Sequence, residues 1–162
     1  MASIEVDQST KIGDTHAPTV LAMADDVEWS LLISAAVKRA CIQTLRGRWK
    51  SKTVLYFRLF AAALFLLLRE HLERIDQIVI DIEYPGHERD IKSDLLRFCR
   101  QAGFSIDPDI VCFALVGKRS RVHRIAIETL RGKRLPDVVV TTGELLQVIG
   151  VKNKRPGPVL TP

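Results

Sequence analysis

The chain has 162 residues, the length of a single domain, and its 47% apolar content is enough to fill one hydrophobic core. The formal net charge of +5 favours a polyanionic partner. Three widely spaced cysteines in apolar surroundings, Cys41, Cys99 and Cys112, indicate neither a disulfide framework nor a zinc knuckle.

The first residues, MASIEVDQSTK, lack the basic start and apolar core of a secretory signal, so we expect an intracellular, cytoplasmic protein. Patterns typical of strands follow over residues 4–9 and 19–24. Residues 29–33 also fit a helical stripe, but a third strand is the preferred interpretation. An acidic two-residue turn at Asp25-Asp26 suits a hairpin, so we expect a three-stranded meander.

Two helices are predicted next, over residues 35–45 and 54–68. The second reads VLYFRLFAAALFLLL, contains Arg58 and is shorter than the roughly 20 apolar residues that a membrane-spanning helix needs. Apolar residues on all sides are typical of a helix that the rest of a core covers. We therefore expect a buried helix and no membrane partner.

The stretch DQIVIDIEYPG combines a strand-forming apolar run with two carboxylates. Because side chains alternate along a strand, Asp81 and Glu83 are expected on one face, and Ile78 and Ile80 on the other. A carboxylate in a buried strand is costly unless a positive group meets it. A divalent cation is one such partner. The alternative is a strand end at which both acids lie in water or pair with lysine or arginine.

The remaining elements alternate between strand and helix. Strands are predicted over residues 77–84, 110–116 and 137–140, helices over 88–102 and 120–130, and a helical turn over 143–149. Such alternation predicts parallel pairing through right-handed crossovers. We expect one α/β domain over residues 1–151, with a helical insertion at about 35–75. A basic, proline-containing flexible tail is expected over 152–162.

This order of elements resembles the ribonuclease-H-like superfamily, which includes ribonuclease H, RuvC-type resolvases, transposases and retroviral integrases. The superfamily's metal-binding aspartate of the first strand falls on Asp7 in IEVDQSTK. Its acid of the fourth strand falls on either Asp81 or Glu83 in IVIDIEYPG, and the acid or histidine of its last helix falls on His123 in GKRSRVHRIA. The resemblance covers residues 4–130. It implies a mixed sheet, antiparallel in its first three strands and parallel thereafter, with helices on both faces.

The resemblance also implies that the first and fourth strands are neighbours, which would bring Asp7 close to Asp81. Mg²⁺ or Mn²⁺ held by Asp7 and by Asp81 or Glu83 would activate a water and stabilise the leaving oxygen of a phosphodiester. His123 would complete the site or carry a proton. The structural alternatives are a surface aspartate on an alternating strand and a solvated histidine on a basic helix.

Basic residues form three groups, of which we interpret two as nucleic-acid-binding; the third is Arg131, Lys133 and Arg134. The first of these two groups surrounds Trp49 and consists of Arg46, Arg48, Lys50 and Lys52. The second lies at the start of the helix that contains His123 and consists of Lys118, Arg119, Arg121 and Arg124. These residues would hold phosphates with little reading of bases. The structural alternative is a set of solvated helix ends, where cations also suit the helix dipole.

Together these features predict a divalent-metal-dependent nuclease that hydrolyses phosphodiester bonds in structured nucleic acid, with DNA preferred over RNA. The resolvase resemblance further implies a homodimer. One alternative is a non-catalytic nucleic-acid-binding or assembly module with structural acids. Another is a small-molecule-binding α/β domain with a pocket at the strand ends and no metal. The sequence contains neither a Gly-rich phosphate loop nor a nucleophile elbow.

Overall fold

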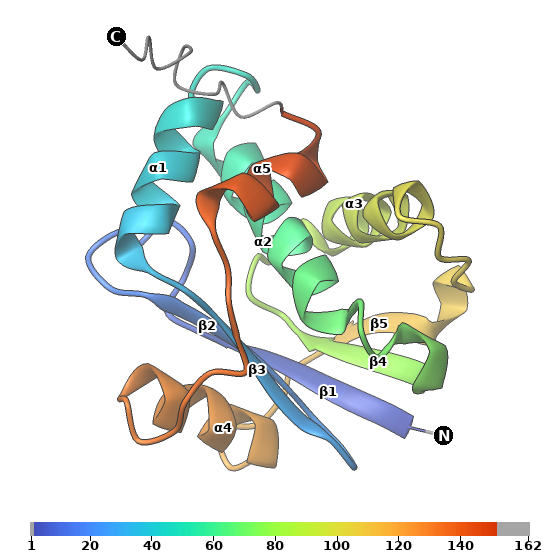
Figure 1. Cartoon of the computed structure of the whole chain (residues 1–162). Coiled ribbons are helices and arrows are strands. Elements are labelled where there is room, and N and C mark those ends of the chain that lie inside the picture. The colour runs from blue at the N-terminus through green and yellow to red at the C-terminus, as the bar shows by residue number, and fades with distance from the viewer. Residues whose placement is uncertain (1, 152–162) are drawn as a thin grey trace, which may run out of the picture.

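The computed structural model describes residues 2–151 (Figure 1), and the predicted tail over 152–162 lies outside the described residues. The first half contains β1 (Ala2–Ser9), β2 (Thr19–Ala24), β3 (Glu28–Ile33), α1 (Ala35–Leu45), α2 (Lys52–Leu68) and a 3₁₀ turn, Leu72–Arg74. The second half contains β4 (Ile75–Asp81), α3 (Glu88–Gln101), a 3₁₀ turn at Pro108–Ile110, β5 (Val111–Ala114), α4 (Arg121–Leu130), β6 (Val138–Val139) and α5 (Thr142–Ile149).

The strands form one mixed sheet in the order β5-β4-β1-β2-β3-β6. Strands β1, β2 and β3 are antiparallel neighbours, whereas β4 pairs parallel with β1, β5 with β4, and β6 with β3. The predicted α/β class, with an antiparallel first part and parallel later strands, is confirmed. The expected adjacency of the first and fourth strands is also confirmed, since Val6 lies opposite Ile80 in the ladder between β1 and β4.

Residues 28–33 form a strand, so the helical alternative for this stretch is wrong. Trp29 pairs with Met23 and Leu31 with Leu21, while the other edge of β3 pairs Leu32 with Val139. The backbone N–H and C=O groups on both edges of β3 therefore have hydrogen-bond partners in the sheet. This pairing stabilises the strand more than a helical arrangement of the same apolar residues would.

Helices cover both faces of the sheet (Figure 1). On one face α4 packs alone, and its Val122 and Ile125 form a small core with Val20 and Ala22 of β2. The other four helices lie on the opposite face, where α2 contributes most of the main core. Because β2 is covered on both sides, all six of its residues are buried.

Helix α2 begins at its cap Ser51, whose hydroxyl accepts the Val54 N–H at 3.3 Å. Every residue from 59 to 68 is buried, as predicted for a core helix. None of the apolar residues of α2 is exposed, so this helix presents no patch that would indicate a dimer. The homodimer therefore stays a prediction. Over residues 2–151, no helix combines the length and the apolar character that a membrane crossing requires.

Candidate metal centre

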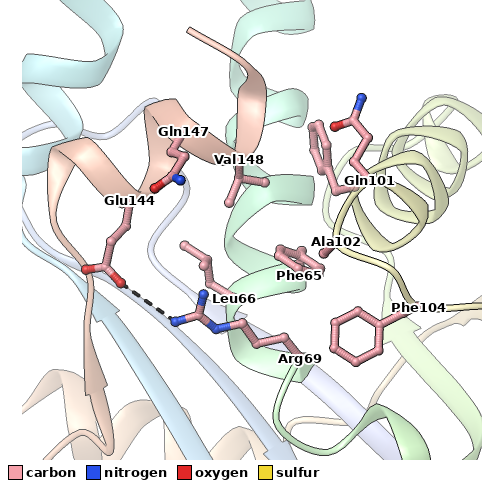
Figure 2. Close-up of a pocket in the computed structure, with 10 residues that line it drawn as sticks. Phe65, Leu66, Arg69, Gln101, Ala102, Phe104, Glu144, Gln147 and Val148 are labelled. Atoms are coloured by element: carbon pink, nitrogen blue, oxygen red, sulfur yellow. Dashed lines mark ion pairs between the residues drawn. The ribbon is translucent and has the colours of Figure 1, made fainter. Parts of the chain in front are cut away.

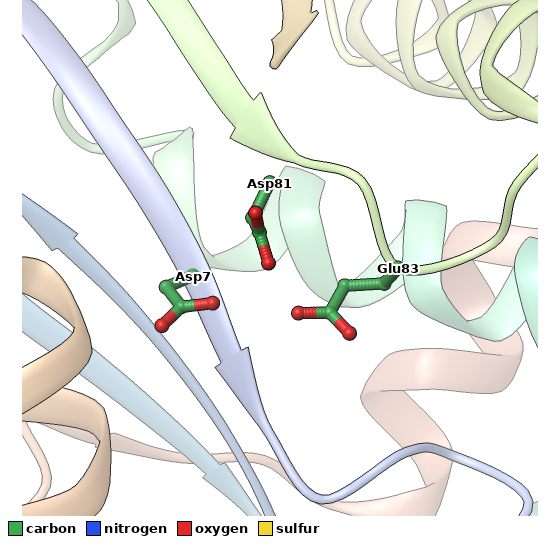
Figure 3. A group of neighbouring side chains, drawn as sticks. All are labelled: Asp7, Asp81 and Glu83. Carbon is green, nitrogen blue, oxygen red and sulfur yellow. The ribbon is translucent and has the colours of Figure 1, made fainter. Parts of the chain in front are cut away.

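Three parallel strands, β1, β4 and β5, end at the same edge of the sheet, and carboxylates gather there. Asp7 comes from the last part of β1, and Asp81 is the final residue of β4. Figure 3 shows these two side chains and Glu83 pointing toward one another. One oxygen from each of the three carboxylates lies within 4.8 Å of the others. The expected proximity of Asp7 and Asp81 is thus confirmed.

Glu83 belongs to this cluster although the fourth strand is shorter than predicted. The fourth strand was expected to continue to residue 84, but β4 ends at Asp81. The Ile82 N–H still bonds to the Ala114 carbonyl at 3.2 Å, after which the chain turns through Gly86 at φ 87°. Asp81 and Glu83, two residues apart on either side of Ile82, still point into the same cluster, as strand alternation predicted.

Asp7 is held by two hydrogen bonds and is only 3% exposed, so the alternative of a surface aspartate is wrong. Its Oδ1 accepts the Gln8 N–H at 2.9 Å, and its Oδ2 lies 2.7 Å from Nδ1 of His123. Burial raises the pKa of Asp7, while the hydrogen bond to His123 opposes that rise. The aspartate and the helical histidine therefore act as one unit.

His123 is positioned by the start of α4. The Ser120 hydroxyl caps this helix by accepting the His123 N–H at 3.2 Å. This cap places the imidazole in the first turn, above the end of β1. The His123 side chain is 28% exposed, so its ring connects the buried Asp7 carboxylate to the surface.

Asp81 is fixed by a backbone donor from the neighbouring strand. Its Oδ1 accepts the Val116 N–H at 2.7 Å, just beyond the end of β5. Sequence reasoning did not identify Val116, and no side-chain pattern marks it because the contribution is a main-chain N–H. The parallel pairing of β4 with β5 brings this donor to the cluster.

The crowding of the three carboxylates disfavours the ionised form of Glu83. Burial, followed by the neighbouring Asp81 and Asp7, raises the pKa of Glu83 to about 9. A divalent cation would take the place of the proton that this arrangement retains. Hard carboxylate oxygens are the ligands that Mg²⁺ and Mn²⁺ prefer. The donor set therefore fits the predicted metal, with both Asp81 and Glu83 placed to hold it.

A basic groove of about 490 Å³ opens beside His123 on the outer side of α4; we call it the α4 groove. Among the residues that line it are Lys118, Arg119, Ser120, His123, Arg124 and Arg131. Three of the basic residues predicted from this region thus share one surface with His123. Arg131 belongs to the third basic group, which was not among the predicted nucleic-acid-binding residues. Its spacing of seven from Arg124, about two helical turns, is the signal that places both on one face.

Arg121 lies apart from this groove. Its Nε donates to Oε1 of Glu28 at 2.7 Å, and its NH1 donates to the Asp25 carbonyl, also at 2.7 Å. Arg134 pairs with the other oxygen of Glu28 at 2.5 Å. Through these contacts Arg121 connects α4 to the turn between β2 and β3, on a different side from the carboxylates.

The other predicted basic group lies at a second hollow, of about 430 Å³, between α1 and the start of α2; we call it the α1–α2 pocket. Arg46, Lys50 and Lys52 line this pocket together with Trp49, whereas Arg48 does not. Six of the eight predicted basic residues thus divide between the α4 groove and the α1–α2 pocket, and Arg48 and Arg121 line neither.

A third hollow, of about 400 Å³, lies among α2, α3 and α5 (Figure 2). Its walls include Phe65 and Phe104, and Arg69 pairs with Glu144 across it at 3.9 Å. Arg69 follows α2 and is close in the chain to the first residue of β4, so this hollow lies toward the opposite end of the strands from the carboxylates. It is not the strand-end pocket that the small-molecule alternative requires.

Comparison of the chain with family models, with curated proteins and with solved structures returned no match.

Proposed function

We propose that the chain is a divalent-metal-dependent nuclease of ribonuclease-H-like architecture that hydrolyses phosphodiester bonds in structured nucleic acid. The observation that carries the proposal is the convergence of Asp7, Asp81 and Glu83 at the carboxyl ends of three parallel strands. Ligands of open α/β sheets bind at such ends. The adjacency of β1 and β4 agrees with the arrangement that the family resemblance implies.

Each residue of the centre has a role that its position supports. Mg²⁺ or Mn²⁺ held by the three carboxylates would supply an activated water and stabilisation of the leaving oxygen. Asp7 and Asp81 are already oriented, by His123 and by the Val116 N–H respectively. His123 orients Asp7 through Nδ1, and its partial exposure allows the ring to exchange a proton with solvent or substrate.

The α4 groove supports a nucleic-acid substrate. It places the cations of Lys118, Arg124 and Arg131 beside His123, with no acidic residue among the side chains that line it. Phosphates would be held there mainly by charge, so affinity falls steeply with salt and depends little on sequence. We infer DNA as the preferred substrate, recognised by shape.

The experiment is a cleavage assay on branched DNA, RNA/DNA hybrid and single strands with Mg²⁺, Mn²⁺ or EDTA. Wild-type protein is expected to cleave only with metal. Asp7→Asn and Asp81→Asn are each expected to lower the rate by at least about a hundredfold, because several kcal/mol of transition-state stabilisation depend on the metal. Asp76→Asn is the matched control, since Asp76 is an exposed acid at the amino end of the same strand, β4.

One observation favours the alternative of a non-catalytic nucleic-acid-binding module. Two of the acids already have partners within the protein, Asp7 with His123 and Asp81 with the Val116 N–H, as structural acids would. That module would leave every substrate intact in the assay above. It would also bind nucleic acid equally well after Asp7→Asn, and this pair of results would overturn the nuclease proposal.

A further inference from the structure

The α1–α2 pocket carries cations that form no ion pair with an acid of residues 2–151. From Trp29 to Arg69 the sequence contains eight lysines and arginines and no aspartate or glutamate. Within residues 2–151, Arg58 and Arg69 of this stretch form ion pairs, but the three cations at the pocket, Arg46, Lys50 and Lys52, form none. Uncompensated cations that face one hollow attract an anion.

The pocket also contains the elements of a base-stacking site. Trp49 and Tyr56, both half-buried, line it next to the cations. The Arg58 guanidinium lies 4.7 Å from the centre of the Trp49 ring, and Arg58 in turn pairs with Asp94 at 3.5 Å, so the indole is held in place. Grooves that bind unpaired strands combine cations that follow the backbone with aromatic rings on which bases stack.

The start of α2 adds backbone donors to these cations. Ser51 and Lys52 line the pocket at the first turn of a 17-residue helix. The Ser51 hydroxyl accepts the Val54 N–H, while the preceding N–H groups of that turn have no partner within the helix. A phosphate at this place would meet both the helix dipole and the lysine ammonium groups.

One loop connects the pocket to the metal centre. The segment between β1 and β2 begins right after Ser9, two residues beyond Asp7, and includes Lys11. Two residues later Gly13 lines the pocket and packs so closely on Tyr56 that a Cβ there would lie 2.9 Å from Cε2 of the ring. Asp7 and Gly13 are thus at most roughly 20 Å apart along the chain.

Helix α1 holds this loop in place. The buried Lys38 ammonium donates to the main-chain carbonyls of Lys11, at 3.4 Å, and Asp14, and Arg39 donates to the Thr15 carbonyl at 2.9 Å. The distance between the carboxylates and the pocket is therefore set by packing and not by a free loop.

From these contacts, and on the basis of the nuclease function proposed above, we infer that the α1–α2 pocket receives an unpaired nucleotide of the same nucleic acid whose phosphodiester lies at the metal centre. The base stacks on Trp49 and Tyr56, and Lys50 and Lys52 hold its phosphates. The substrate is accordingly DNA that contains an unpaired strand next to a duplex, such as a fork or a branch.

The experiment measures fluorescence anisotropy of labelled forked DNA, and of a blunt duplex of the same sequence, in EDTA so that no cleavage occurs. Full-length wild-type protein is expected to bind the fork more tightly. Trp49→Ala is expected to weaken fork binding by roughly 5- to 150-fold, the range for removal of one stacked base, with little change for the blunt duplex. Trp49→Phe, which keeps a ring, is expected to retain part of this preference.

The variant Lys50→Glu/Lys52→Glu tests the phosphate-binding role without disturbing the core, because both side chains are exposed. The slope of log affinity against log salt for the fork is expected to fall by roughly 0.7 for each phosphate that the variant no longer binds. Arg48→Ala is the matched control, since Arg48 belongs to the same loop and does not line the pocket. It is expected to leave the fork preference unchanged.

Equal wild-type affinity for fork and blunt duplex would overturn the inference, and so would a fork preference that survives in both the Trp49→Ala and the double-lysine variant. Either result would leave metal-dependent cleavage, which is measured separately, as it stands. Conversely, the protein could bind the fork through this pocket and yet cleave no substrate. That result would support the inferred nucleotide-binding role of the α1–α2 pocket and contradict the nuclease proposal.

Discussion

At the scale of single residues, the hydrogen bond between Asp7 and His123 connects the carboxylate cluster at the end of β1 to helix α4. The two residues are 116 positions apart in the chain, and their side chains meet at 2.7 Å. Removing one member of a buried charged pair leaves the other without compensation. A second buried group, Lys38, has no carboxylate partner and bonds only to main-chain oxygens among the residues that the structure describes.

For His123→Ala, we expect cleavage to fall by about 10- to 100-fold, the usual effect of removing a residue that orients a metal ligand. The metal concentration that gives half-maximal activity should rise as well, because Oδ2 of Asp7 no longer has its donor. His123→Gln, which retains a donor, should recover part of the metal affinity. A fall in rate with unchanged metal dependence would contradict a positioning role.

Lys38 should make stability depend on pH. Burial lowers the pKa of this lysine to about 8, from an ordinary value of 10.5, and the charge of Asp14 opposes the effect. Between those values the unfolded chain binds more protons than the folded protein, so the free energy of unfolding increases as the pH rises. Relative to Lys38→Met, wild-type protein should thus gain stability from pH 8 to 10.5 in urea titrations. Parallel curves for the two proteins would contradict the assignment.

At the scale of elements, α4 divides its residues by face. One face carries Val122, Ile125 and Ala126 into the core against β2, and the groove face carries Arg124 and Arg131. Arg121 begins the helix on a third side and ties it to Glu28. The cations that are adjacent in the sequence therefore separate into residues that line the α4 groove and a residue in structural ion pairs only once the helix is docked.

The double variant Arg124→Ala/Arg131→Ala should reduce the salt dependence of duplex binding. The slope of log affinity against log salt is expected to fall by about 0.9 for each phosphate that the variant no longer neutralises. Arg121→Ala is the matched control, and we expect it to keep the wild-type slope. It should lower the free energy of unfolding by only about 0.2–1 kcal/mol, as for other exposed ion pairs. Equal slopes for the wild type and the double variant would exclude the α4 groove as the duplex site.

At the scale of the whole molecule, the candidate metal centre joins parts of the fold that no local interaction connects. Its carboxylates come from the first strand and from the end of the fourth, and its histidine comes from the helix on the opposite face to the main core. A ligand that binds only this assembled arrangement stabilises the folded state as a unit.

We expect Mn²⁺ to raise the melting temperature of the wild-type protein. At a concentration about 100 times the dissociation constant the gain is about 2.7 kcal/mol, with about 2–4 °C expected for each kcal/mol at this chain length. Glu83→Gln should melt higher than the wild type in EDTA, because it removes a carboxylate crowded by Asp81 and Asp7, and should gain less from Mn²⁺. Equal Mn²⁺ shifts in the two proteins would show that Glu83 is not a ligand.

Much of the fold follows from local patterns. Apolar alternation placed β1 and β2, and the capping serines Ser51 and Ser120 precede helices near the predicted positions. The sequence was ambiguous where two interpretations share one pattern, and the prediction was wrong where the chain bends. Residues 29–33 satisfy both helix and strand spacing, and the preferred strand is what the structure contains. The fourth strand was expected to reach residue 84 but ends at Asp81, before the turn that follows it.

The sequence by itself determined which chemistry is available: Asp7, Asp81 and Glu83 as hard oxygen donors, His123 as a titratable partner, and an acid-free basic stretch after Trp29. Residue types and short-range periodicity are properties of the chain alone, so they can be read before folding. Tertiary structure alone decided that the three carboxylates lie within 4.8 Å of one another and that the basic residues divide between two surfaces. Both outcomes depend on long-range strand pairing and helix docking, which no local pattern specifies.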